Sequence, residues 1–590
     1  MGHTELNDGK PAVSRWIWIG LLCAFIFMSM ASGLLRHNGI HFIGDNAMRM
    51  VEIRDLVNGQ SWFDTTQYRD NTPYGGPMHW SRLIDGPVAL IIIALRPVLG
   101  VAGAEAAAQI IWPMLVFTAL AILLVLTAEW LAGRAAGAFA ALVAALAVPI
   151  HNDFPIAGLD HHNVQAVLAV LAMLTTLRAR TSARWAVAAG LTAATIIAIA
   201  TEGLPIIAAQ LLVIPLFWVF DPARNGRPML AFGASFGLGT LGHLLLVTPP
   251  AAWFEVHCDA ISFTYVSVAL LYALAVFISW GLWRRFGGGL LVRFIALGIL
   301  GLAAMGVALW LSPECRAGPY GNLPPWLADI LLTPIGEAQP IWIWLMPFRT
   351  ASALVLLPVF ALIAAIAAVV VDRERRADWL VVVAFAATTI LVTILQVRGI
   401  RVASIIGIPA AAWAISRAWR AFRNAQSAAT AARLVGTALL FMGIIHWLIA
   451  MGLAEITGTQ QRVINVLNDR LDECNLYESY SRLNALPPSR LMSYLIIGPQ
   501  ILLNTRHSIV SAGYHRNIEG LKDEVQFFGG TEAEARAVVE KRDLDYLVTC
   551  RGIDPSEALA GVPVFKGYDW DWLTPISGPD EPLQIYRIAR

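Results

Sequence analysis

Long apolar runs recur through most of this chain, and they constrain its fold more than any other feature. A helix that spans a bilayer needs about 20 largely apolar residues, and about thirteen runs of this kind occur in the sequence. Only 14% of the 590 residues are charged, whereas soluble proteins have about 25% charged residues. The sequence therefore predicts a polytopic α-helical membrane protein. The predicted spans are residues 16–35, 106–130, 134–151, 163–179, 183–200, 203–220, 228–247, 264–283, 290–311, 350–371, 379–396, 402–418 and 432–453.

Two further features of the apolar pattern need an interpretation of their own. The run 88–99 is interrupted by Arg96 and Pro97 and is too short to span, so we predict a helix that lies at the membrane surface. The first run, 16–35, is longer than a signal-peptide core of about 7–15 residues. We therefore expect it to be a retained first helix.

Arginine clusters follow alternate predicted spans and indicate an orientation. Short cytoplasmic loops of membrane proteins carry an excess of Lys and Arg. With a cytoplasmic N-terminus in a cell inner membrane, all the clusters fall on the cytoplasmic side. They are Arg178 with Arg180, Arg224 with Arg227, Arg284 with Arg285, Arg373 with Arg375 and Arg376, and Arg417 with Arg420 and Arg423. The segments expected outside are then 36–104, 152–162, 248–263, 312–349, 397–401, the turn at Glu202 and everything after about 454.

The sequence changes character after about residue 454, where it becomes polar and rich in turn residues. Residues 491–497 and 546–550 are typical of strands, and residues 532–541 are typical of a helix with Thr531 as its N-cap. This alternation predicts a small extracytoplasmic α/β domain, 454–590, attached to a transmembrane domain, 1–453.

The cysteines and the net charge bear on possible partners. None of the five cysteines has the CxxC or other spacing of a structural zinc site. Cys474 and Cys550 both lie in the predicted outer domain, where a disulfide is allowed, but spacing alone does not fix the pairing. The net charge of +1 provides no basic field for nucleic acid.

Ionisable side chains gather in three outer loops, beginning with 36–104. Asp45 in this loop is either the cap of a helix that begins near Ala47 or a residue with a chemical role. Tyr68-Arg69-Asp70 and His79-Trp80-Ser81-Arg82 add an aromatic and basic cluster. Such a cluster anchors a protein at the bilayer surface or holds a sugar or a lipid phosphate, because Arg pairs bidentately with phosphate.

The second outer loop places Asp160, His161 and His162 in a row at the mouth of an apolar helix. Ionisable groups are costly there unless they have a function. In an extended backbone, Asp160 and His162 share a face and reach one ion, whereas His161 points elsewhere. The alternative is that Asp160 caps a helix starting near Asn163.

The third loop, 312–349, contains Glu337 in a turn flanked by Gly and Pro. Taken alone, Glu337 is a surface carboxylate. Together with Asp45, Asp160 and His162, it completes a set of oxygen and nitrogen groups suited to Mg²⁺ or Mn²⁺. The predicted topology puts all three loops on one side, where a divalent ion would stabilise a phosphate or diphosphate leaving group.

These residues and the predicted topology resemble the catalytic subunit of the oligosaccharyltransferases, in the GT-C class of membrane glycosyltransferases. That family has thirteen spans and an outer C-terminal domain. Asp45 matches its aspartate in the first outer loop, and Asp160-His161-His162 matches its Asp-x-Asp-like motif in the second. Glu337, followed by Ala338-Gln339-Pro340, matches its Thr-x-x-Glu motif, although Thr333 lies one place too far away.

The resemblance implies that Asp45, Asp160 and His162 hold the metal and that Glu337 positions the acceptor. Asp45 is also the carboxylate best placed to act as the base for an acceptor hydroxyl. One carboxylate does not easily serve as sole base and tight ligand at once, so both roles stay open.

The resemblance also implies an arginine that binds the donor phosphate at the start of the next-to-last span. Arg401 occupies that place, Arg398 is a near alternative, and Arg82 in the first outer loop is a further candidate.

The family's Trp-Trp-Asp-Tyr-Gly motif, which reads the acceptor sequon, is absent from the predicted outer domain. In that domain, Tyr514, His515 and Arg516 form either a local acceptor contact or only a turn packed on the domain. We therefore do not expect this chain to glycosylate asparagine in sequons.

The expected function is a metal-assisted transfer of a sugar or glycan from a polyprenyl-phosphate or polyprenyl-diphosphate donor, in membrane lipid, to an unknown acceptor. A related transferase that modifies lipid A or a polysaccharide is a close alternative. A transporter or lipid flippase would instead carry ionisable residues near the middle of its spans. A non-catalytic scaffold would tolerate the removal of every loop carboxylate.

Overall fold

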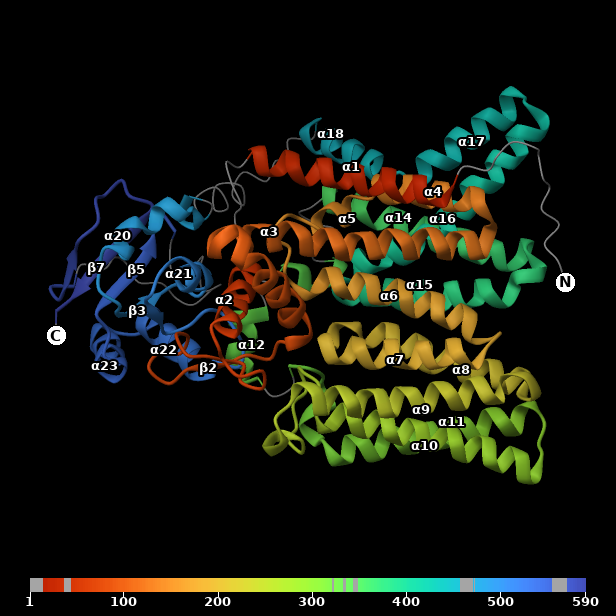
Figure 1. Ribbon diagram of the computed structural model, residues 1–590, viewed down its shortest axis with the longest axis horizontal. Coiled ribbons are helices and arrows are strands. Elements are labelled where there is room, and N and C mark those ends of the chain that lie inside the picture. Colours follow the sequence, from red (N-terminus) through yellow and green to blue (C-terminus); the bar gives the residue numbers. More distant parts are fainter. Residues whose placement is uncertain are drawn as a thin grey trace.

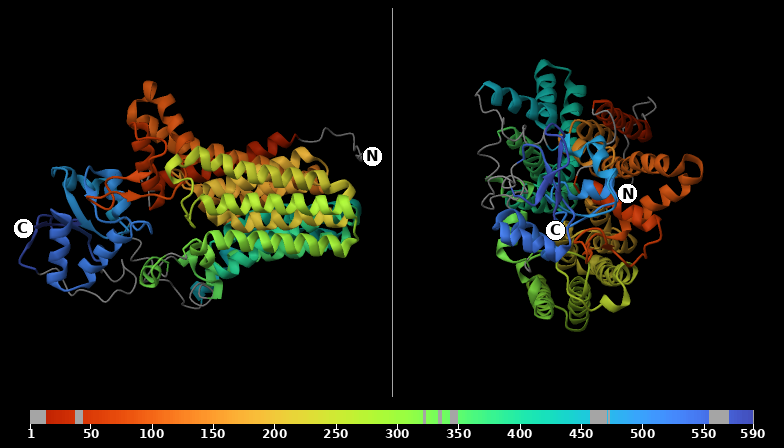
Figure 2. Two further views of the ribbon diagram at one scale, coloured as in Figure 1. Left: turned by 90° about the horizontal axis from the view of Figure 1, so that it is seen from below. Right: turned by 90° about the vertical axis from the view of Figure 1, so that its left-hand side faces the viewer.

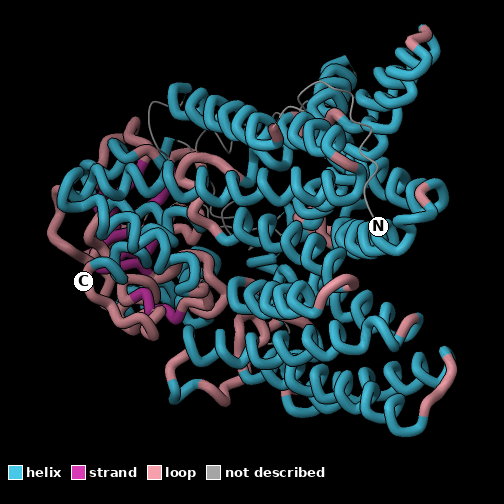
Figure 3. Tube along the Cα trace, turned by 45° about the vertical axis from the view of Figure 1, so that its right-hand side comes forward, coloured by secondary structure: helices cyan, strands magenta, loops and turns pink. Residues whose placement is uncertain are grey.

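The structure is a computed structural model that describes residues 14–36, 44–320, 323–332, 336–342, 349–456, 471, 473–553 and 570–589. Long helices lie side by side in a bundle, and a small domain with a β-sheet covers one end of it (Figure 1). The strands gather at that end, as the magenta segments of Figure 3 show. The predicted fold class, a polytopic helical protein with a small C-terminal α/β domain, is confirmed.

Every predicted span coincides with a helix or with a pair of consecutive helices. Within the described residues, seven helices are long and apolar enough to cross a membrane, or eight if one bent pair is a single span. The helices of the bundle are α1 (Arg15–Arg36), α3 (Arg82–Ala132), α4 (Arg134–Ala145), α5 (Val148–Asp153), α6 (His161–Ala179), α7 (Ala183–Ile199), α8 (Leu204–Phe220), α9 (Pro222–Val247), α10 (Phe263–Phe286), α11 (Leu290–Leu311), α14 (Arg349–Val371), α15 (Arg376–Leu395), α16 (Gly399–Ala425), α17 (Ala428–Phe441) and α18 (Gly443–Ile456).

Two of the predicted spans are broken where the sequence analysis expected single helices. Residues 134–151 form α4 and then α5, and residues 432–453 form α17 and α18, which are bent by 76°. The two breaks meet, because the N–H of Ile444 donates to the carbonyl of Leu146 at 3.0 Å. Each break thus provides a hydrogen-bonding group that an unbroken helix would have used internally.

The predicted surface helix at 88–99 is the first part of α3. Gly100, with φ 71° and ψ −179°, interrupts the helical backbone, a conformation that only glycine adopts at low cost. The part of α3 before this break leaves the bundle sideways in both views of Figure 2. Its apolar side chains Leu90 and Val98 are 67% and 81% exposed, so its position on a bilayer surface stays a prediction.

The C-terminal domain contains a five-stranded sheet in the order β4-β3-β5-β7-β6, with β4, β3 and β5 parallel and β7 and β6 antiparallel. The strands are β3 (Arg490–Ser493), β4 (Ser508–Ile509), β5 (Tyr546–Cys550), β6 (Leu573–Pro575) and β7 (Leu583–Ile588), and the helices are α20 (Ser481–Asn484), α21 (Gly498–Asn504), α22 (Ile518–Gly529) and α23 (Glu532–Arg542).

The local predictions for this domain are largely confirmed. Strand β5 and helix α23 have the expected positions, and Thr531 caps α23 in a reciprocal capping box with Glu534. The pairing that spacing left open exists, because Cys474 and Cys550 form a disulfide. The strand predicted at 491–497 was wrong beyond residue 493, since the chain turns there toward α21.

The first outer loop is built into the C-terminal domain. It forms α2 (Asp45–Val57) and a two-stranded ribbon of β1 (Thr66–Gln67) and β2 (Gly76–Pro77). The apolar face of α2 belongs to the same hydrophobic core as the sheet. The loop also extends the edge of β4, because the N–H of Thr72 donates to the carbonyl of Ile509 at 2.9 Å and the N–H of Ile509 donates to the carbonyl of Arg69 at 2.8 Å.

Candidate functional site

A cavity of about 370 Å³ lies where the ends of the bundle helices meet the C-terminal domain. Residues from the first, second and later outer loops line it together. They include Asp45, His79, His161, His162, Glu202, Asp259, Tyr320, Glu337, Arg398, Tyr514 and His515. The structure therefore brings three loops with predicted site residues to one place.

Asp160, His161 and His162 form a compact cluster at the start of α6. Asp160 is the N-cap of this helix, and its carboxylate accepts a hydrogen bond from the backbone N–H of His161 at 2.6 Å. Its other carboxylate oxygen lies 3.3 Å from Nε2 of His162. Burial alone would raise the pKa of Asp160, but the neighbouring His161 and His162 hold it below its ordinary value.

The sequence left two interpretations of this motif open, a group of metal ligands and a helix cap formed by Asp160, and the structure contains features of both. Asp160 does cap a helix, although the helix begins at His161 rather than near Asn163. The prediction that His161 points elsewhere was wrong, because one ligand atom from each of Asp160, His161 and His162 lies within 4.8 Å of the others. On the first turn of a helix, unlike in a strand, consecutive side chains do not alternate between two faces.

Glu202 connects the two histidines to Arg398, the N-cap residue of α16. It lies in a 3-10 turn between α7 and α8, and its Oε2 is 3.1 Å from Nδ1 of His162 and 3.4 Å from Nε2 of His161. Its other oxygen forms an ion pair with Arg398. The sequence analysis noted Glu202 only as a charged group near a span, because nothing in its local sequence indicates these partners.

Arg401 and Glu337, both predicted site residues, form an ion pair with each other. Arg401 also lies 3.4 Å from Asp153 at the end of α5. The turn that carries Glu337 is fixed to α16, because the backbone N–H of Arg398 donates to the carbonyl of Glu337 at 2.8 Å. Thr333 lies outside the described residues.

A helix begins near Ala47 as expected, but Asp45 is its first residue rather than its cap. The cap is Gly44, and no side chain makes a capping hydrogen bond, so the capping alternative for Asp45 was wrong. The φ of 54° and ψ of −120° at Gly44 turn the chain into the helix. The hydroxyl of Tyr514 donates to Asp45 Oδ1 at 3.1 Å. Burial, together with the nearby Asp160 carboxylate, raises the pKa of Asp45 to about 6.

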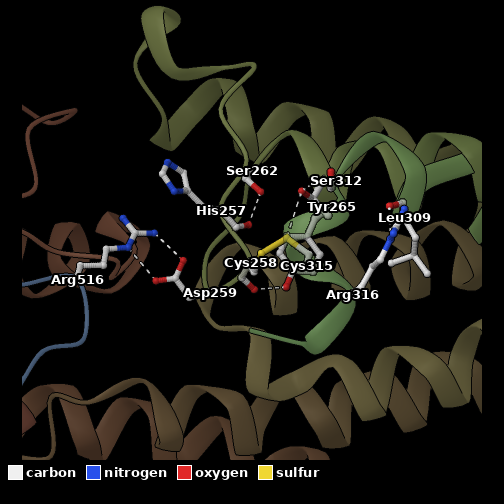
Figure 4. The surroundings of a disulfide bond; sticks show 11 residues. His257, Cys258, Asp259, Ser262, Tyr265, Leu309, Ser312, Cys315, Arg316 and Arg516 are labelled. Atoms are coloured by element: carbon white, nitrogen blue, oxygen red, sulfur yellow. Dashed lines mark hydrogen bonds and ion pairs between the residues drawn. A yellow bond between two sulfur atoms is a disulfide. The ribbon is translucent and has the colours of Figure 1, made fainter. Parts of the chain in front are cut away.

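His515 and Arg516 do not reach toward Asp45 but bind Asp259, in the loop between α9 and α10. Nε2 of His515 lies 2.7 Å from Asp259 Oδ2, and Arg516 donates to both oxygens of Asp259 at 2.8 Å. Asp259 directly follows Cys258, which forms a disulfide with Cys315 (Figure 4). Neither Asp259 nor this disulfide was predicted, because the loop has no motif.

A second cavity, of about 350 Å³, opens beside the first between α8, α15 and α16. Most of its lining surface is apolar, and Arg398 and Arg401 are among the polar residues that line it. His162, Glu202 and Arg398 line both cavities. We call the first cavity the polar chamber and the second the apolar groove.

Arg82 is not part of either cavity, which corrects the prediction that it binds donor phosphate. It is 1% exposed and pairs with Asp85 at 3.2 Å. Its guanidinium also donates to Gln60 Oε1 at 3.1 Å. Those contacts bury Arg82 within the first outer loop.

The residues around Asp160 fit a divalent cation. Nδ1 of His161 is buried and lies 2.6 Å from Asp160 Oδ1, yet it makes no hydrogen bond within the described part of the chain. Burial and, after it, the charge of Asp160 raise the pKa of Asp45. A cation among carboxylate oxygens and imidazole nitrogens would relieve both features.

Comparison with known proteins gives likeness at the level of fold. No protein-family model matches the chain, and no curated protein matches its sequence. Among solved structures, the chain is similar to the archaeal oligosaccharyltransferase AglB from Archaeoglobus fulgidus in complex with an inhibitory peptide and a dolichol-phosphate. The TM-score is 0.66 at 15% identity, over 92% of this chain and 70% of that one.

Two other structures of the Archaeoglobus fulgidus enzyme give the same result. One, in complex with Zn and sulfate, has a TM-score of 0.62 at 13% identity and covers 98% of this chain and 73% of that one. The other, tethered to an acceptor peptide with an NVT sequon, has a TM-score of 0.64 at 14% identity and covers 92% and 70%. The chain therefore has the GT-C fold of membrane glycosyltransferases, as found in the archaeal oligosaccharyltransferase.

Proposed function

We propose that this chain is a membrane glycosyltransferase that moves a sugar or glycan from a polyprenyl-linked phosphate or diphosphate to an acceptor at the extracytoplasmic face. The observation that carries the proposal is the meeting of the polar chamber and the apolar groove. His162, Glu202 and Arg398 line both. A ligand that fits both cavities has a long apolar part, a charged junction and a polar head, as a polyprenyl-linked sugar has.

The proposed place of the donor phosphate is between Arg398 and Arg401. Arginine binds phosphate bidentately, and both side chains line the apolar groove. In the structure, Glu202 forms an ion pair with Arg398 and Glu337 forms one with Arg401. A bound phosphate would therefore share the two arginines with these carboxylates or displace the carboxylates from them. The archaeal enzyme was solved with a dolichol-phosphate, which is a ligand of this chemical class.

The proposed metal ligands are Asp45, Asp160 and His162, with His161 now added. Mn²⁺ or Mg²⁺ at this place would neutralise the charge that develops on the departing phosphate. Imidazole ligands favour Mn²⁺ over Mg²⁺, which prefers oxygen ligands alone. The archaeal structure with Zn and sulfate shows that a protein of this fold accepts a divalent ion and an anion.

In the proposed reaction, an acceptor hydroxyl attacks the anomeric carbon, the bond from that carbon to the phosphate oxygen breaks, and the hydroxyl proton passes to a base. Glu337 positions the acceptor, and Tyr514 contacts it beside Asp45. Because the sequon-reading motif is absent, a hydroxyl on a lipid, polysaccharide or protein side chain is the proposed acceptor. Asp45 is either the base or a metal ligand.

An Asp45→Asn variant separates those two roles. The amide keeps a neutral oxygen but does not take up a proton at neutral pH. If Asp45 is the base, transfer is lost while Mn²⁺ affinity is nearly unchanged. If Asp45 is a ligand, Mn²⁺ affinity falls together with transfer.

The proposed function is tested by sugar transfer and release from radiolabelled polyprenyl-linked donors of several classes, with purified protein in lipid vesicles. The assay is run with EDTA, Mg²⁺ or Mn²⁺, and with Asp160→Ala and Glu337→Gln. Asp378→Asn is the matched control, because Asp378 also pairs with an arginine, Arg180, at 3.2 Å, but lines neither cavity.

The expected result is metal-dependent release that both site variants lose and Asp378→Asn keeps. Sugar release that is the same with and without metal, and is unchanged by both substitutions, would contradict the proposed metal site. Movement of uncleaved donor across the vesicle membrane would indicate instead that the protein is a flippase.

A further inference from the structure

A second group of metal-ligand side chains lines the polar chamber. His79 comes from the loop before α3, Asp259 from the loop before α10, and His515 from the C-terminal domain. One ligand atom from each lies within 4.8 Å of the others. The ring centres of His79 and His515 are 4.5 Å apart, so three segments distant in sequence place their side chains around one point.

One nitrogen of the His79 imidazole has no hydrogen-bond partner among the residues that the structure describes. This atom, Nδ1, is buried. Leaving a buried polar atom unpaired costs about 1–3 kcal/mol, and such atoms in native structures usually have a ligand, a water or a function. A neutral imidazole is also the form that binds a metal.

The carboxylate of Asp259 is oriented in the way that metal ligands commonly are. Arg516 donates to both of its oxygens at 2.8 Å, and hydrogen bonds of this kind hold ligating carboxylates in place. The disulfide from Cys258 to Cys315 fixes the adjacent backbone (Figure 4). The third group, His515, is already 2.7 Å from Asp259 Oδ2.

The donor set also indicates which metal fits. Two imidazoles and one carboxylate whose charge is shared with Arg516 form a nitrogen-rich group of low negative charge. Mg²⁺ and Ca²⁺ prefer sets of oxygen ligands, whereas zinc sites with two histidines and one carboxylate keep a fourth position open. Zinc is therefore the divalent cation that this group would select.

We propose that His79, Asp259 and His515 form a zinc site, separate from the cluster at Asp160, that ties the first outer loop, the loop before α10 and the C-terminal domain together over the polar chamber. The proposal does not depend on the glycosyltransferase function. It predicts that zinc stabilises the fold even when no donor or acceptor is present.

The test measures zinc bound per chain by mass spectrometry of the metal, after EDTA treatment and equilibration with zinc in excess Mg²⁺. All chains carry Asp160→Asn, which weakens the first cluster. We expect about one zinc per chain, and at least a tenfold loss of zinc affinity when His79→Ala or His515→Gln is added, since even residues behind the ligands change affinity by 10–100-fold.

His257→Gln in the same background is the matched control. His257 lies two residues from Asp259 and contacts Glu255 at 3.1 Å, outside the proposed group. It should keep the zinc and the zinc-dependent rise in melting temperature, both of which His79→Ala should lose. Melting temperatures measured in EDTA identify a variant that fails to fold. If either His79→Ala or His515→Gln fails to fold, the zinc affinity of the other variant tests the proposal.

Zinc stoichiometry that is equal with and without His79→Ala and His515→Gln would overturn the proposal. So would the absence of retained zinc in the Asp160→Asn chain. In either case Asp259, His515 and Arg516 form only a hydrogen-bonded contact between two loops.

Discussion

The polar chamber has two walls that are built in different ways. The inner wall consists of His161, His162, Glu202 and Arg398, which lie at the ends of bundle helices. Asp160 supports it, because it caps α6 and contacts both histidines. The outer wall consists of His79, Asp259, Tyr514 and His515, which lie in loops and in the C-terminal domain.

The difference lies in what fixes each wall. A helix end is fixed by the packing of the whole helix in the bundle, so the inner wall needs no special cross-link. The outer wall is held by contacts between distant segments, namely a disulfide from Cys258 to Cys315 and the pairing of Arg516 with Asp259. We therefore expect changes in the inner wall to affect chemistry, and changes in the outer wall to affect stability and ligand binding.

The largest effect is expected at Asp160, where capping and chemistry are separable. Asn caps helices as well as Asp does, so Asp160→Asn should fold normally but lose about 100- to 1,000-fold in transfer rate, which is typical for removing one electrostatic contributor. The measurement is the initial rate of sugar transfer from a labelled donor. A wild-type rate in Asp160→Asn together with a destabilised Asp160→Ala would mean that Asp160 is only a cap.

The next effect concerns the disulfide of the outer wall. Replacing both Cys258 and Cys315 by Ser should lower stability by about 2–4 kcal/mol and weaken donor or zinc binding. The matched control replaces Cys474 and Cys550, which also form a disulfide but do not line the polar chamber. Thermal unfolding should show losses of similar size for both pairs, whereas only the first pair should change binding. Equal binding in both would contradict the role assigned to the first disulfide.

The C-terminal domain behind the outer wall should become less stable as the pH rises. Burial raises the pKa of Glu524 to about 8 from its ordinary value of 4.5. The folded chain therefore keeps a proton that the unfolded chain releases, so stability falls between about pH 4.5 and pH 8. The melting temperature of the full chain in detergent should be lower at pH 8 than at pH 5. Glu524→Gln should reduce that difference, and an unchanged difference would rule out Glu524 as its source.

The smallest effect is expected for Tyr514→Phe, which removes one hydrogen bond between the outer wall and Asp45. The hydroxyl of Tyr514 donates to Asp45 at 3.1 Å, and a single hydrogen bond contributes about 0.5–1.5 kcal/mol. The transfer rate should fall by about two- to tenfold, with little change in melting temperature. A loss as large as that of Asp160→Asn would mean that Tyr514 belongs with the reacting groups rather than with the support of Asp45.

Part of the candidate site was predictable because its residues carry local signals. Asp160, His161 and His162 are unusual at the mouth of an apolar helix, and Glu337 stands out in its turn. The partners of these residues were not predictable. Glu202 pairs with both histidines and with Arg398, but its sequence neighbours are apolar and give no indication of it. Arg82 gave a misleading signal, since an arginine in an aromatic cluster also serves as a buried structural cation.

The sequence by itself determined the helices of the bundle, the existence of a small C-terminal α/β domain and the loops that hold the ionisable groups. These follow from the cost of exposing polar backbone to lipid, which apolar length alone reveals. Only the tertiary structure decided that the first outer loop joins the core of the C-terminal domain and that Asp259 meets His515 and Arg516. The physical reason is that pairing across hundreds of residues depends on how loops pack, and loop packing leaves no periodic pattern in the chain.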